Sequence, residues 1–436
     1  MISAIITLII VLGLVIFVHE LGHFVAAKRL GVKVEEFGFG FPPRLFGFQR
    51  FSGQKLEKLA EEEKIELTLT DYKVNGDTEV IKETVSDKIQ EIDEIKMTKK
   101  WHFFLGNHLP NEQENLKGGT VYSINWLPLG GFVKIKGEQG DQKEEKDSFT
   151  HKKIWQRSLI LSSGVLMNIV LATILISIGF YIGLPSVVSG DSETNRIRDL
   201  KIQIVSLASG SPAETADIKV GDTIKSINGQ QFTTAEEVQN YNKERLGQTV
   251  SVTIQRGKET IEKEITLAEV DELGVGKMGV GLVETGLVSY SWYRAIWEGI
   301  KAAFYLTWQI LVAFYELIKN LIVTQAVPPD IAGPIGIAVL TSQISRLGFI
   351  YILQFTALLS INLAILNFIP FPALDGGRVL LLLVEKIRGK ALNQRIESLI
   401  HTAGFFIIIA FLIVVSVKDV SRFKESILGF FKNIIG

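Results

Sequence analysis

Residues 2–18 read ISAIITLIIVLGLVIFV and lead directly into His19-Glu20-Leu21-Gly22-His23, and this stretch decides the kind of fold. The run is uncharged, and about 20 apolar residues at a helical rise of about 1.5 Å cross a hydrocarbon layer of about 30 Å. A signal peptide fits less well, because no basic residues precede the run and no small-x-small cleavage site follows it before Lys28. We therefore expect a membrane-spanning helix.

Three further uncharged stretches are long enough to span a membrane: residues 158–182, 348–369 and 399–417. Residues 292–323 are also apolar, but their polar side chains recur mostly at three-, four- or seven-residue intervals and so share one helix face. That pattern is typical of a helix lying on the bilayer surface, because a charged stripe is costly in lipid. The sequence predicts four spans, with a fifth over 292–323 as the alternative.

Basic residues flank the predicted spans unevenly. They follow the first span, precede the second and follow the third: Lys28, Arg29, Lys33; Lys152, Lys153, Arg157; Arg378, Lys386, Arg388, Lys390. The positive-inside rule then predicts residues 30–157 and 376–397 in the cytoplasm and 185–345 outside. Basic residues after the fourth span argue against this orientation, although their alternation with apolar residues also suits an amphipathic helix on the membrane.

The composition narrows the possible classes of protein. The 436 residues are 47% apolar, and 46 Lys and Arg against 47 Asp and Glu leave a net charge of −1. Without a basic surplus, nucleic acid is not expected as the main partner. The chain has no cysteine, which excludes disulfides, thiolate chemistry and zinc sites with sulfur ligands.

The motif at 19–23 has the spacing of a metal site. Histidines at i and i+4 project from one helix face, so His19 and His23 can both reach one zinc ion. Glu20 can reach the water bound to that metal, and would serve as general base and then as proton donor to the leaving amine. The motif also arises by chance in soluble proteins, but ionisable residues in an apolar span are functional by default.

A hydrolytic zinc ion needs a third protein ligand and one open position. The third span ends in Asn367-Phe368-Ile369-Pro370-Phe371-Pro372-Ala373-Leu374-Asp375-Gly376-Gly377. Two prolines break the helix there, and irregular backbone at membrane depth is tolerated only where it is buried in protein or lines a wet cavity. An Asp-Gly pair alone is more often a turn. Combined with the histidine pair, it makes Asp375 the expected third ligand.

These residues resemble the site-2 protease family of intramembrane zinc metalloproteases, in particular the bacterial regulator-of-sigma-E protease group. The family carries His-Glu-x-x-His in one span and Asn-x-x-Pro-x-Pro-x-Leu-Asp-Gly in a later one, and both are complete here at 19–23 and 367–376. Residues 164–168 (GVLMN) resemble its approach to the second span, with Val165 where the family usually has proline.

The resemblance implies a role for each matching position. His19, His23 and Asp375 would bind Zn²⁺, Glu20 would activate water, and Asn168 and Asn367 would hold the substrate backbone or the developing oxyanion. Asparagines in spanning helices also serve as hydrogen-bonding links between helices, which is the alternative for both. Asn362 is a weaker candidate of the same kind.

Residues 202–231 (IQIVSLASGSPAETADIKVGDTIKSINGQQ) look like a PDZ domain. Ser211-Pro212 would open a helix, Asn228-Gly229 would form a hairpin turn, and alternation over 250–254 indicates a strand. PDZ domains bind an extended chain or a free C-terminus by strand addition. The resemblance implies a domain outside the membrane that admits substrates already shortened by a first protease, with a purely structural role as the alternative.

Residues 36–41 and 126–134 resemble the family's membrane-associated β elements, in which Gly130 and Gly131 would contact substrate; a plain cytoplasmic hairpin is the alternative. The charged insertion at 51–117 is expected to hold a β hairpin around Asn75-Gly76 and a helix over 85–95. It is expected to be a solvated, family-specific insertion, with a partner-binding module as the alternative. Four other histidines lack ligand spacing and are expected to be ordinary surface or interface residues: His102, His108, His151 and His401.

The sequence therefore predicts a polytopic α-helical membrane protein with four transmembrane helices, membrane-associated β elements and an extracytoplasmic α+β PDZ domain. The expected segments are 1–50 (first span and start of the β segment), 51–117 (insertion), 118–157 (β hairpin and lead-in), 158–184 (second span), 195–270 (PDZ domain), 271–345 (linker and interfacial helix), 346–397 (third span and cytoplasmic segment) and 398–436 (fourth span and tail). The oligomeric state stays open.

The expected activity is that of a zinc endopeptidase in a bacterial inner membrane. Its substrates would be single-pass membrane proteins such as anti-sigma-factor-like regulators, or signal-peptide remnants, in regulated intramembrane proteolysis. Its partners would be these transmembrane substrates, pre-cleaved by another protease, and the lipid bilayer. The rival functions are a PDZ adaptor with a degenerate site, a zinc transporter, and a prenyl-protein type of zinc protease, which draws its third ligand from a glutamate.

Overall fold

The computed structural model describes residues 2–51, 101–107, 118–138, 140, 142, 144–187, 197–208, 210–257, 259–268, 278–323, 333–390 and 392–422. The hairpin expected around Asn75-Gly76, the helix expected over 85–95 and the tail beyond residue 422 lie outside this range. The chain divides into two compact units. One comprises Leu8–Ile169 and Leu363–Val414, and the other comprises Met1–Thr7, Val170–Asn362 and Val415–Gly436.

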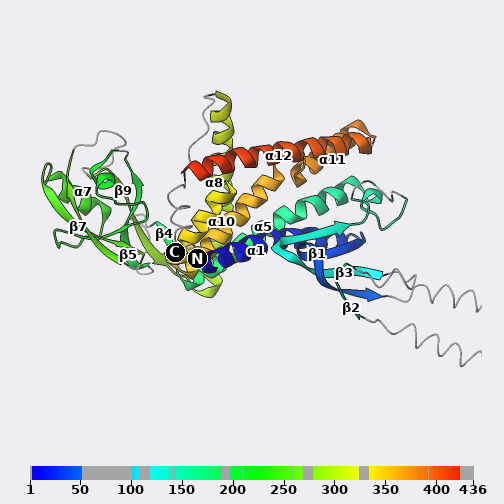
Figure 1. Ribbon diagram of the computed structural model, residues 1–436, viewed down its shortest axis with the longest axis horizontal. Coiled ribbons are helices and arrows are strands. Elements are labelled where there is room, and N and C mark those ends of the chain that lie inside the picture. Colours follow the sequence, from blue (N-terminus) through cyan, green and yellow to red (C-terminus); the bar gives the residue numbers. More distant parts are fainter. Residues whose placement is uncertain are drawn as a thin grey trace, which may run out of the picture. The chain divides into compact units, whose positions relative to one another are not determined.

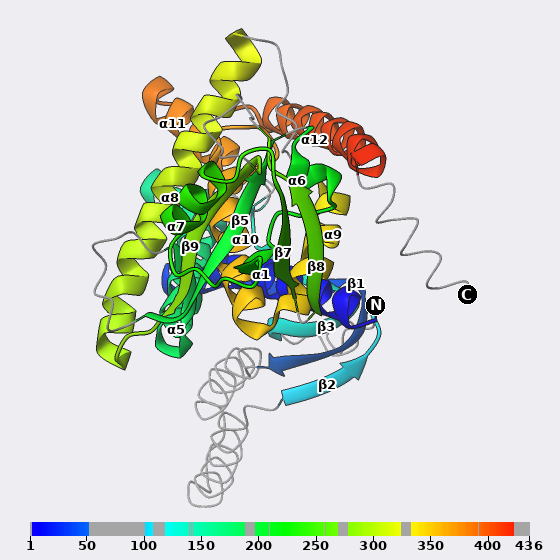
Figure 2. The same cartoon turned by 90° about the vertical axis from the view of Figure 1, so that its left-hand side faces the viewer.

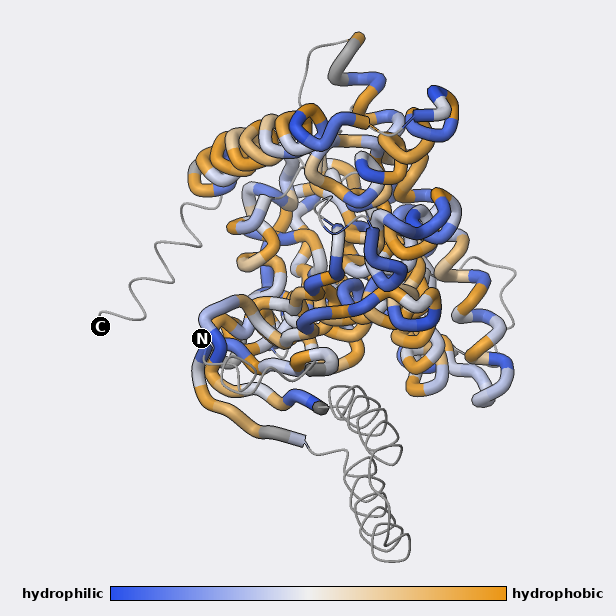
Figure 3. The backbone as a smooth tube through the Cα atoms, turned by 90° about the vertical axis from the view of Figure 1, so that its right-hand side faces the viewer, coloured by the Kyte–Doolittle hydropathy of each residue, from blue (hydrophilic) through white to orange (hydrophobic). Residues whose placement is uncertain are grey.

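Four helices in the described parts of the chain are long and apolar enough to cross a membrane, which confirms the predicted number. They are α1 (Ile2–Arg29), α5 (Ile154–Ile182), α10 (Phe349–Phe368) and α12 (Gln394–Arg422). Helices α5 and α12 begin before the uncharged stretches that predicted them, because the helical hydrogen bonding continues into polar turns. In Figure 3, the helix leading into the C-terminal trace is coloured as hydrophobic along most of its length.

Residues 292–323 form one continuous helix, α8 (Trp292–Val323), which is not among the candidate spans. Its buried side chains are small, Ala295 and Ala303. Between them Gly299 lies against α5, since a Cβ atom there would stand 2.0 Å from the Ser177 hydroxyl. Aromatic and charged side chains occupy the exposed surface of α8. The predicted amphipathic helix is confirmed, and its place on the bilayer surface stays a prediction.

The first unit contains a three-stranded antiparallel sheet in the order β2-β1-β3 (Figure 1). Its strands are β1 (Val34–Phe51), β2 (Trp101–Leu105) and β3 (Gly118–Ile135). Strand β3 pairs with both edges of the first part of β1: Gly38 faces Phe132 on one side and Ser123 on the other. The predicted β elements at 36–41 and 126–134 therefore pair with each other.

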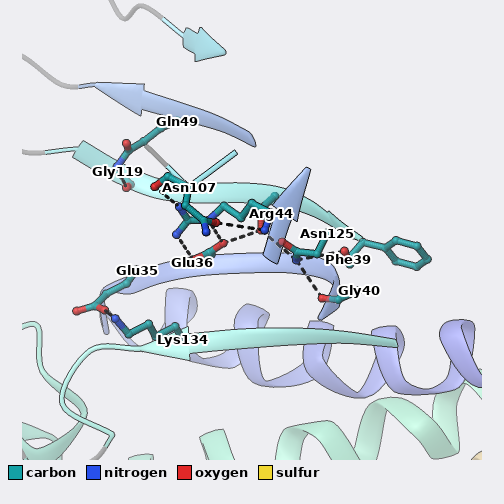
Figure 4. A network of polar contacts seen from close by, with 11 residues as sticks. Glu35, Glu36, Phe39, Gly40, Arg44, Gln49, Asn107, Gly119, Asn125 and Lys134 are labelled. Atoms are coloured by element: carbon teal, nitrogen blue, oxygen red, sulfur yellow. Dashed lines mark hydrogen bonds and ion pairs between the residues drawn. The ribbon is translucent and has the colours of Figure 1, made fainter. Parts of the chain in front are cut away.

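A polar network inside this sheet holds the bend of β1 (Figure 4). The guanidinium of Arg44 donates two hydrogen bonds to the Glu36 carboxylate, at 2.7 and 2.6 Å, and the Ser123 hydroxyl donates a third at 2.7 Å. The two bonds to Glu36 raise the pKa of Arg44 above its ordinary value, against the opposing effect of burial. Because Glu36 and Arg44 lie on the two arms of β1, their pairing fixes the angle between the arms.

An apolar cluster joins the sheet to three helical segments of the same unit: α1, α5 and α11 (Asp375–Arg388). The 3₁₀ turn Phe149–His151 contributes Phe149 to this cluster. Its buried members are Ala27, Val32, Val34, Ile135, Phe149, Ile160, Leu161 and Leu382. An ion pair of 3.1 Å between Arg157 and Glu385 also links α5 to α11. The cluster holds the second half of α1 beside the starts of α5 and α11.

The second unit contains a six-stranded antiparallel sheet in the order β4-β9-β5-β6-β7-β8 (Figure 2). Its strands are β4 (Leu184–Val187), β5 (Ile197–Leu207), β6 (Thr223–Ile227), β7 (Thr249–Arg256), β8 (Glu259–Thr266) and β9 (Val280–Val288). Helices α6 (Pro212–Thr215) and α7 (Ala235–Lys243) complete this domain, and α9 (Pro334–Leu347) precedes α10. The hydrophobic core of the domain with the six-stranded sheet includes Ile204, Ile227, Val252 and Ile254, each at most 1% exposed.

The three local predictions in this domain are confirmed. Ser211 caps α6 by accepting a hydrogen bond from the Glu214 N–H, and β7 contains the expected strand at 250–254. Asn228 and Gly229 do form a tight turn, with φ of 49° and 79°. The expected hairpin turn is confirmed by an antiparallel bridge between Ile227 and Gln230, beyond which the chain continues into α7 while β6 pairs with β5 and β7.

Candidate metal centre

His19 and His23 lie one helical turn apart on the same face of α1. Their side chains are buried, and their Nε2 atoms are 3.3 Å apart. The Nδ1 atom of His23 lies 2.8 Å from the carbonyl oxygen of Ile160 on α5, to which an Nδ1–H donates. This bond leaves the Nε2 lone pair of His23 free to face the interior.

Asp375 reaches the histidines from the far end of the sequence. Helix α10 ends at Phe368, the two prolines prevent its continuation, and α11 begins at Asp375 itself. One carboxylate oxygen, Oδ2, lies 3.0 Å from His19 Nε2 and 3.2 Å from His23 Nε2. The helix break that the two prolines predicted is therefore what places this carboxylate beside the imidazoles.

Two glycines let α1 and α5 cross at this point. A Cβ atom on Gly22 would stand 2.3 Å from the Ser163 carbonyl oxygen, so the two backbones are nearly in contact. A Cβ atom on Gly164 would stand 2.4 Å from His23 Nε2 and 2.8 Å from His19 Cε1. Any side chain at Gly164 would enter the space in front of the imidazoles. Sequence reasoning recognised the 164–168 segment but missed this function of its glycine.

The three donor atoms fit a zinc ion. They form a triangle with sides of 3.0, 3.2 and 3.3 Å. Ligands at about 2.0–2.2 Å from a tetrahedral zinc ion are about 3.3–3.5 Å apart, close to these values. Nitrogen and oxygen donors suit zinc, and three of them leave one position open for water or substrate. The group is thus an adequate set of protein ligands for a catalytic zinc ion.

Two asparagines contact the imidazole of His19. The amide of Asn168, fully buried on α5, lies 3.3 Å from His19 Nδ1, and the amide of Asn367 on α10 lies 3.1 Å from His19 Nε2. Both were singled out from the sequence, and the structure brings both to the same ring. Asn362 instead donates to the Leu358 carbonyl of its own helix.

Three further residues were predicted for the site: Glu20, Gly130 and Gly131. Glu20 is half-buried and interacts electrostatically with His19, His23 and Asp375. Gly130 and Gly131 sit in β3 against Ile16 and Phe17 of α1, just before His19 in the sequence. Gly130 has φ of +94°, which favours glycine.

Among the described residues, no other histidine joins the metal centre. His151 is exposed, whereas the side chain of His102 and all of His108 lie outside the described residues. His401 is half-buried and accepts a hydrogen bond from the Ala373 N–H.

Two imidazoles and a carboxylate held on apolar helices define a membrane-embedded metal-dependent hydrolase. Residues 7–56 and 99–411 match peptidase family M50, and the chain belongs to this family. It is similar to regulator of sigma-W protease RasP of Bacillus subtilis, with 28% identity over 97% of this chain and 99% of that protein. Zinc metalloprotease RasP of Geobacillus kaustophilus is 27% identical, over 97% and 98%. The chain is thus an intramembrane zinc metalloprotease of the RasP type, with several membrane spans.

Part of the chain also resembles a solved PDZ domain. The PDZ domain of the SdrC-like protein from Listeria monocytogenes is 26% identical, covers 19% of this chain and 85% of that one, and has a TM-score of 0.17.

Proposed function

We propose that His19, His23 and Asp375 hold the zinc ion of this protease and that Glu20 transfers protons during peptide hydrolysis. The observation that supports this assignment is the triangle of Nε2, Nε2 and Oδ2 atoms at 3.0–3.3 Å. The glycine at position 164 supports it too, because it keeps the space before these atoms free. A mere interhelical contact would not need such a space.

Each residue has a distinct chemical task. A zinc ion bound here supplies a Lewis acid that lowers the pKa of water from about 16 to about 7. Glu20 accepts the proton from the attacking water and returns it to the amine nitrogen of the leaving peptide. Asn168 orients the imidazole of His19 through Nδ1. Asn367 donates a hydrogen bond to the carbonyl oxygen of the scissile bond as negative charge develops there.

The proposed substrates are single-pass membrane proteins, including anti-sigma-factor-like regulators and signal-peptide remnants. A peptide bond inside a helix is shielded by its own hydrogen bonds, so the scissile segment must become extended before hydrolysis. The part of β3 with Gly130 and Gly131 lies against Ile16 and Phe17 of α1, and we infer that it pairs with such an extended segment. The 195–270 domain, as a PDZ domain outside the cytoplasm, would admit substrates that a first protease has already shortened.

The location proposed is a bacterial inner membrane, with the metal centre near the cytoplasmic side. The basic residues that flank the first three spans support this orientation. A cysteine-reactive label that cannot cross membranes tests it, since the natural chain has no cysteine and each introduced one is a unique probe. We expect a cysteine at exposed Lys225 to react from outside the cell and one at exposed Lys390 to react only after lysis.

The decisive experiment compares wild-type protein with Glu20→Gln in liposomes that contain a single-span substrate peptide. We expect cleavage by the wild type and a loss of at least about 100-fold in Glu20→Gln, because the amide cannot accept the proton. Zinc content should be equal in both, since Glu20 is not a ligand. Equal cleavage by the two proteins would contradict the proposed role of Glu20.

A companion variant, Asp375→Ala, distinguishes this site from its rivals. We expect it to lose zinc, because only two imidazole ligands remain. Undiminished zinc would contradict the proposed ligand set and favour a site that draws its third ligand from a glutamate. An adaptor or a transporter would show no cleavage even in the wild type.

A further inference from the structure

The turn that carries Asp375 contains a residue in a strained conformation. Between the end of α10 and the start of α11, Ala373 has φ of +75°, in the left-handed region. Residues other than glycine rarely occupy this region, and they stay there only where neighbouring groups hold the backbone in place. Ala373 lies two residues before Asp375, so its conformation determines the direction in which the chain enters α11.

The group that holds Ala373 is a side chain of α12. The backbone N–H of Ala373 donates a hydrogen bond of 3.0 Å to Nδ1 of His401. This N–H lies outside the regular bonding of α10 and α11, since α10 ends at Phe368 and α11 begins at Asp375. A half-buried backbone donor without a partner would be unfavourable, so the imidazole satisfies a group that the helix break leaves exposed.

A second contact of α12 supports the same turn. Gly404 lies one helical turn after His401 and so faces the same side of α12. A Cβ atom on Gly404 would stand 2.5 Å from Cβ of Pro372 and 2.6 Å from its carbonyl oxygen. The backbone of α12 therefore packs directly on Pro372, while His401 bonds to the next residue. His401 and Gly404, which are one helical turn apart on α12, therefore contact two consecutive residues of the turn, Ala373 and Pro372.

The hydrogen bond from Ala373 also determines which ring nitrogen of His401 carries the proton. To accept at Nδ1, the neutral ring must carry its proton on Nε2. Within the described parts of the chain, His401 Nε2 is buried and has no hydrogen-bond partner. The ring borders a cavity of about 420 Å³ whose lining includes Arg378 and Glu397. The protein thus uses one nitrogen of His401 for the turn, while the other is buried without a hydrogen-bond partner among the described residues.

We propose that His401 is a positioning residue for Asp375: it locks the left-handed turn at Ala373 and so sets the carboxylate beside the two imidazoles. The proposal rests on the assignment of Asp375 as a zinc ligand. His401 does not touch the metal centre itself, and it acts through the backbone of residues 373–375. Groups that orient metal ligands in this indirect way typically change metal affinity by about 10–100-fold when they are removed.

The test measures zinc affinity by competition with a chelator, together with peptide cleavage, in three variants of His401. His401→Phe keeps the ring but removes the acceptor, and we expect the zinc dissociation constant to rise by about 10-fold or more. His401→Asn places a carbonyl oxygen near the former Nδ1, and we expect most of the affinity to return. His401→Gln places its oxygen near the former Nε2 instead, and we expect it to behave like the phenylalanine variant.

These variants separate positioning from general structural damage. A merely structural role would lower the unfolding temperature of all three variants without distinguishing asparagine from glutamine. Equal zinc affinity in the asparagine and glutamine variants would overturn the proposal, and so would full affinity in His401→Phe. Asp375→Ala is measured alongside: if it keeps its zinc, the ligand assignment itself has failed. If it loses zinc while His401→Phe keeps it, only the positioning role has failed.

Discussion

Gly164 of α5 lies directly against His23 of α1, so that a Cβ atom added to the glycine would stand 2.4 Å from Nε2 of the histidine. The same atom would be within 2.9 Å of His19 Nε2. The two histidines alone would fit many helix pairs. The absent side chain of Gly164 is what turns a crowded helix crossing into a space that a metal ion can occupy.

The first prediction concerns this space. Gly164→Ala should bind zinc at least about 10-fold more weakly and lose cleavage in proportion, because the added methyl group must displace an imidazole. Zinc content and peptide cleavage are measured on protein purified in detergent. Leu166→Ala is a matched control, since Leu166 is two positions further along α5 and 52% exposed. Normal zinc binding by Gly164→Ala would show that α5 can move away without cost.

Removal of the metal gives the second prediction. A zinc ion present at about 100 times its dissociation constant stabilises the folded protein by about 2.7 kcal/mol, because it binds the folded state only. A chelator should therefore lower the unfolding temperature of the wild type, and added zinc should restore it. Asp375→Ala should start at the lower temperature and respond little to the chelator. An equal response in both proteins would place the metal elsewhere.

The local parts of this site could be predicted from sequence because short-range geometry determines them. Because His19 and His23 are four residues apart on a helix, their side chains must project from the same face. Pro370 and Pro372 settle where α10 ends, and the chemistry of zinc calls for a third ligand near that end. The contact between His19 and Asp375 could therefore be predicted although 356 positions separate them, because the two histidines require a third zinc ligand and Asp375 stands at the predicted helix break.

Other features depend on tertiary packing and have no local signal. The bond from Ala373 to His401 joins a backbone N–H to a histidine without ligand spacing. Strand β3 pairs with both edges of β1 through several register shifts, which no alternation of side chains reveals. The turn at Asn228-Gly229 is closed by a bridge between Ile227 and Gln230, but the pairing of β6 with β5 and β7 beyond it has no such local signal. A turn sequence specifies the local backbone and not the strand that follows.

The third prediction concerns the pH dependence of stability. Asp147 accepts a hydrogen bond of 2.8 Å from Lys136, which lowers the pKa of the carboxyl group below its ordinary value of 3.8. The pKa of Lys136 is raised by its bonds to Asp147 and Glu145, which outweigh the effect of burial. Lys33 is a further positive charge that lowers the pKa of Asp147.

The sign of the effect follows from the lowered pKa of Asp147. A carboxylate with a lowered pKa in the folded state stabilises the protein above its ordinary pKa, and this contribution is lost as the pH falls through the folded value. Asp147→Asn should therefore cost about 0.5–1 kcal/mol at pH 7, a modest amount because the side chain is partly exposed. The difference from wild type should shrink as the pH falls below the ordinary pKa of 3.8 and vanish once the pH is below the lowered pKa of the folded state, as followed in unfolding measurements. A difference that persists there would mean that the charge of Asp147 is not its source.

The fourth prediction concerns the start of α9. Asp419 of α12 is buried, and its Oδ2 accepts a hydrogen bond of 2.7 Å from the N–H of Gly336. Helix α9 begins after Gly333, which has no side chain to cap it, so a residue 83 positions away does so instead. Asp419→Ala should cost about 1–2 kcal/mol of unfolding free energy, the upper range for a lost cap.

A comparison of variants shows whether capping is the reason. Asp419→Asn keeps an oxygen that can accept from Gly336, so it should lose less than half of what the alanine variant loses. Val420→Ala, at a neighbouring position that is 46% exposed, should change stability little. If the asparagine and alanine variants are equally destabilised, the negative charge matters more than the hydrogen bond. In that case Asp419 stabilises α9 because its negative charge compensates the partial positive charge at the start of the helix, and not because of the capping geometry.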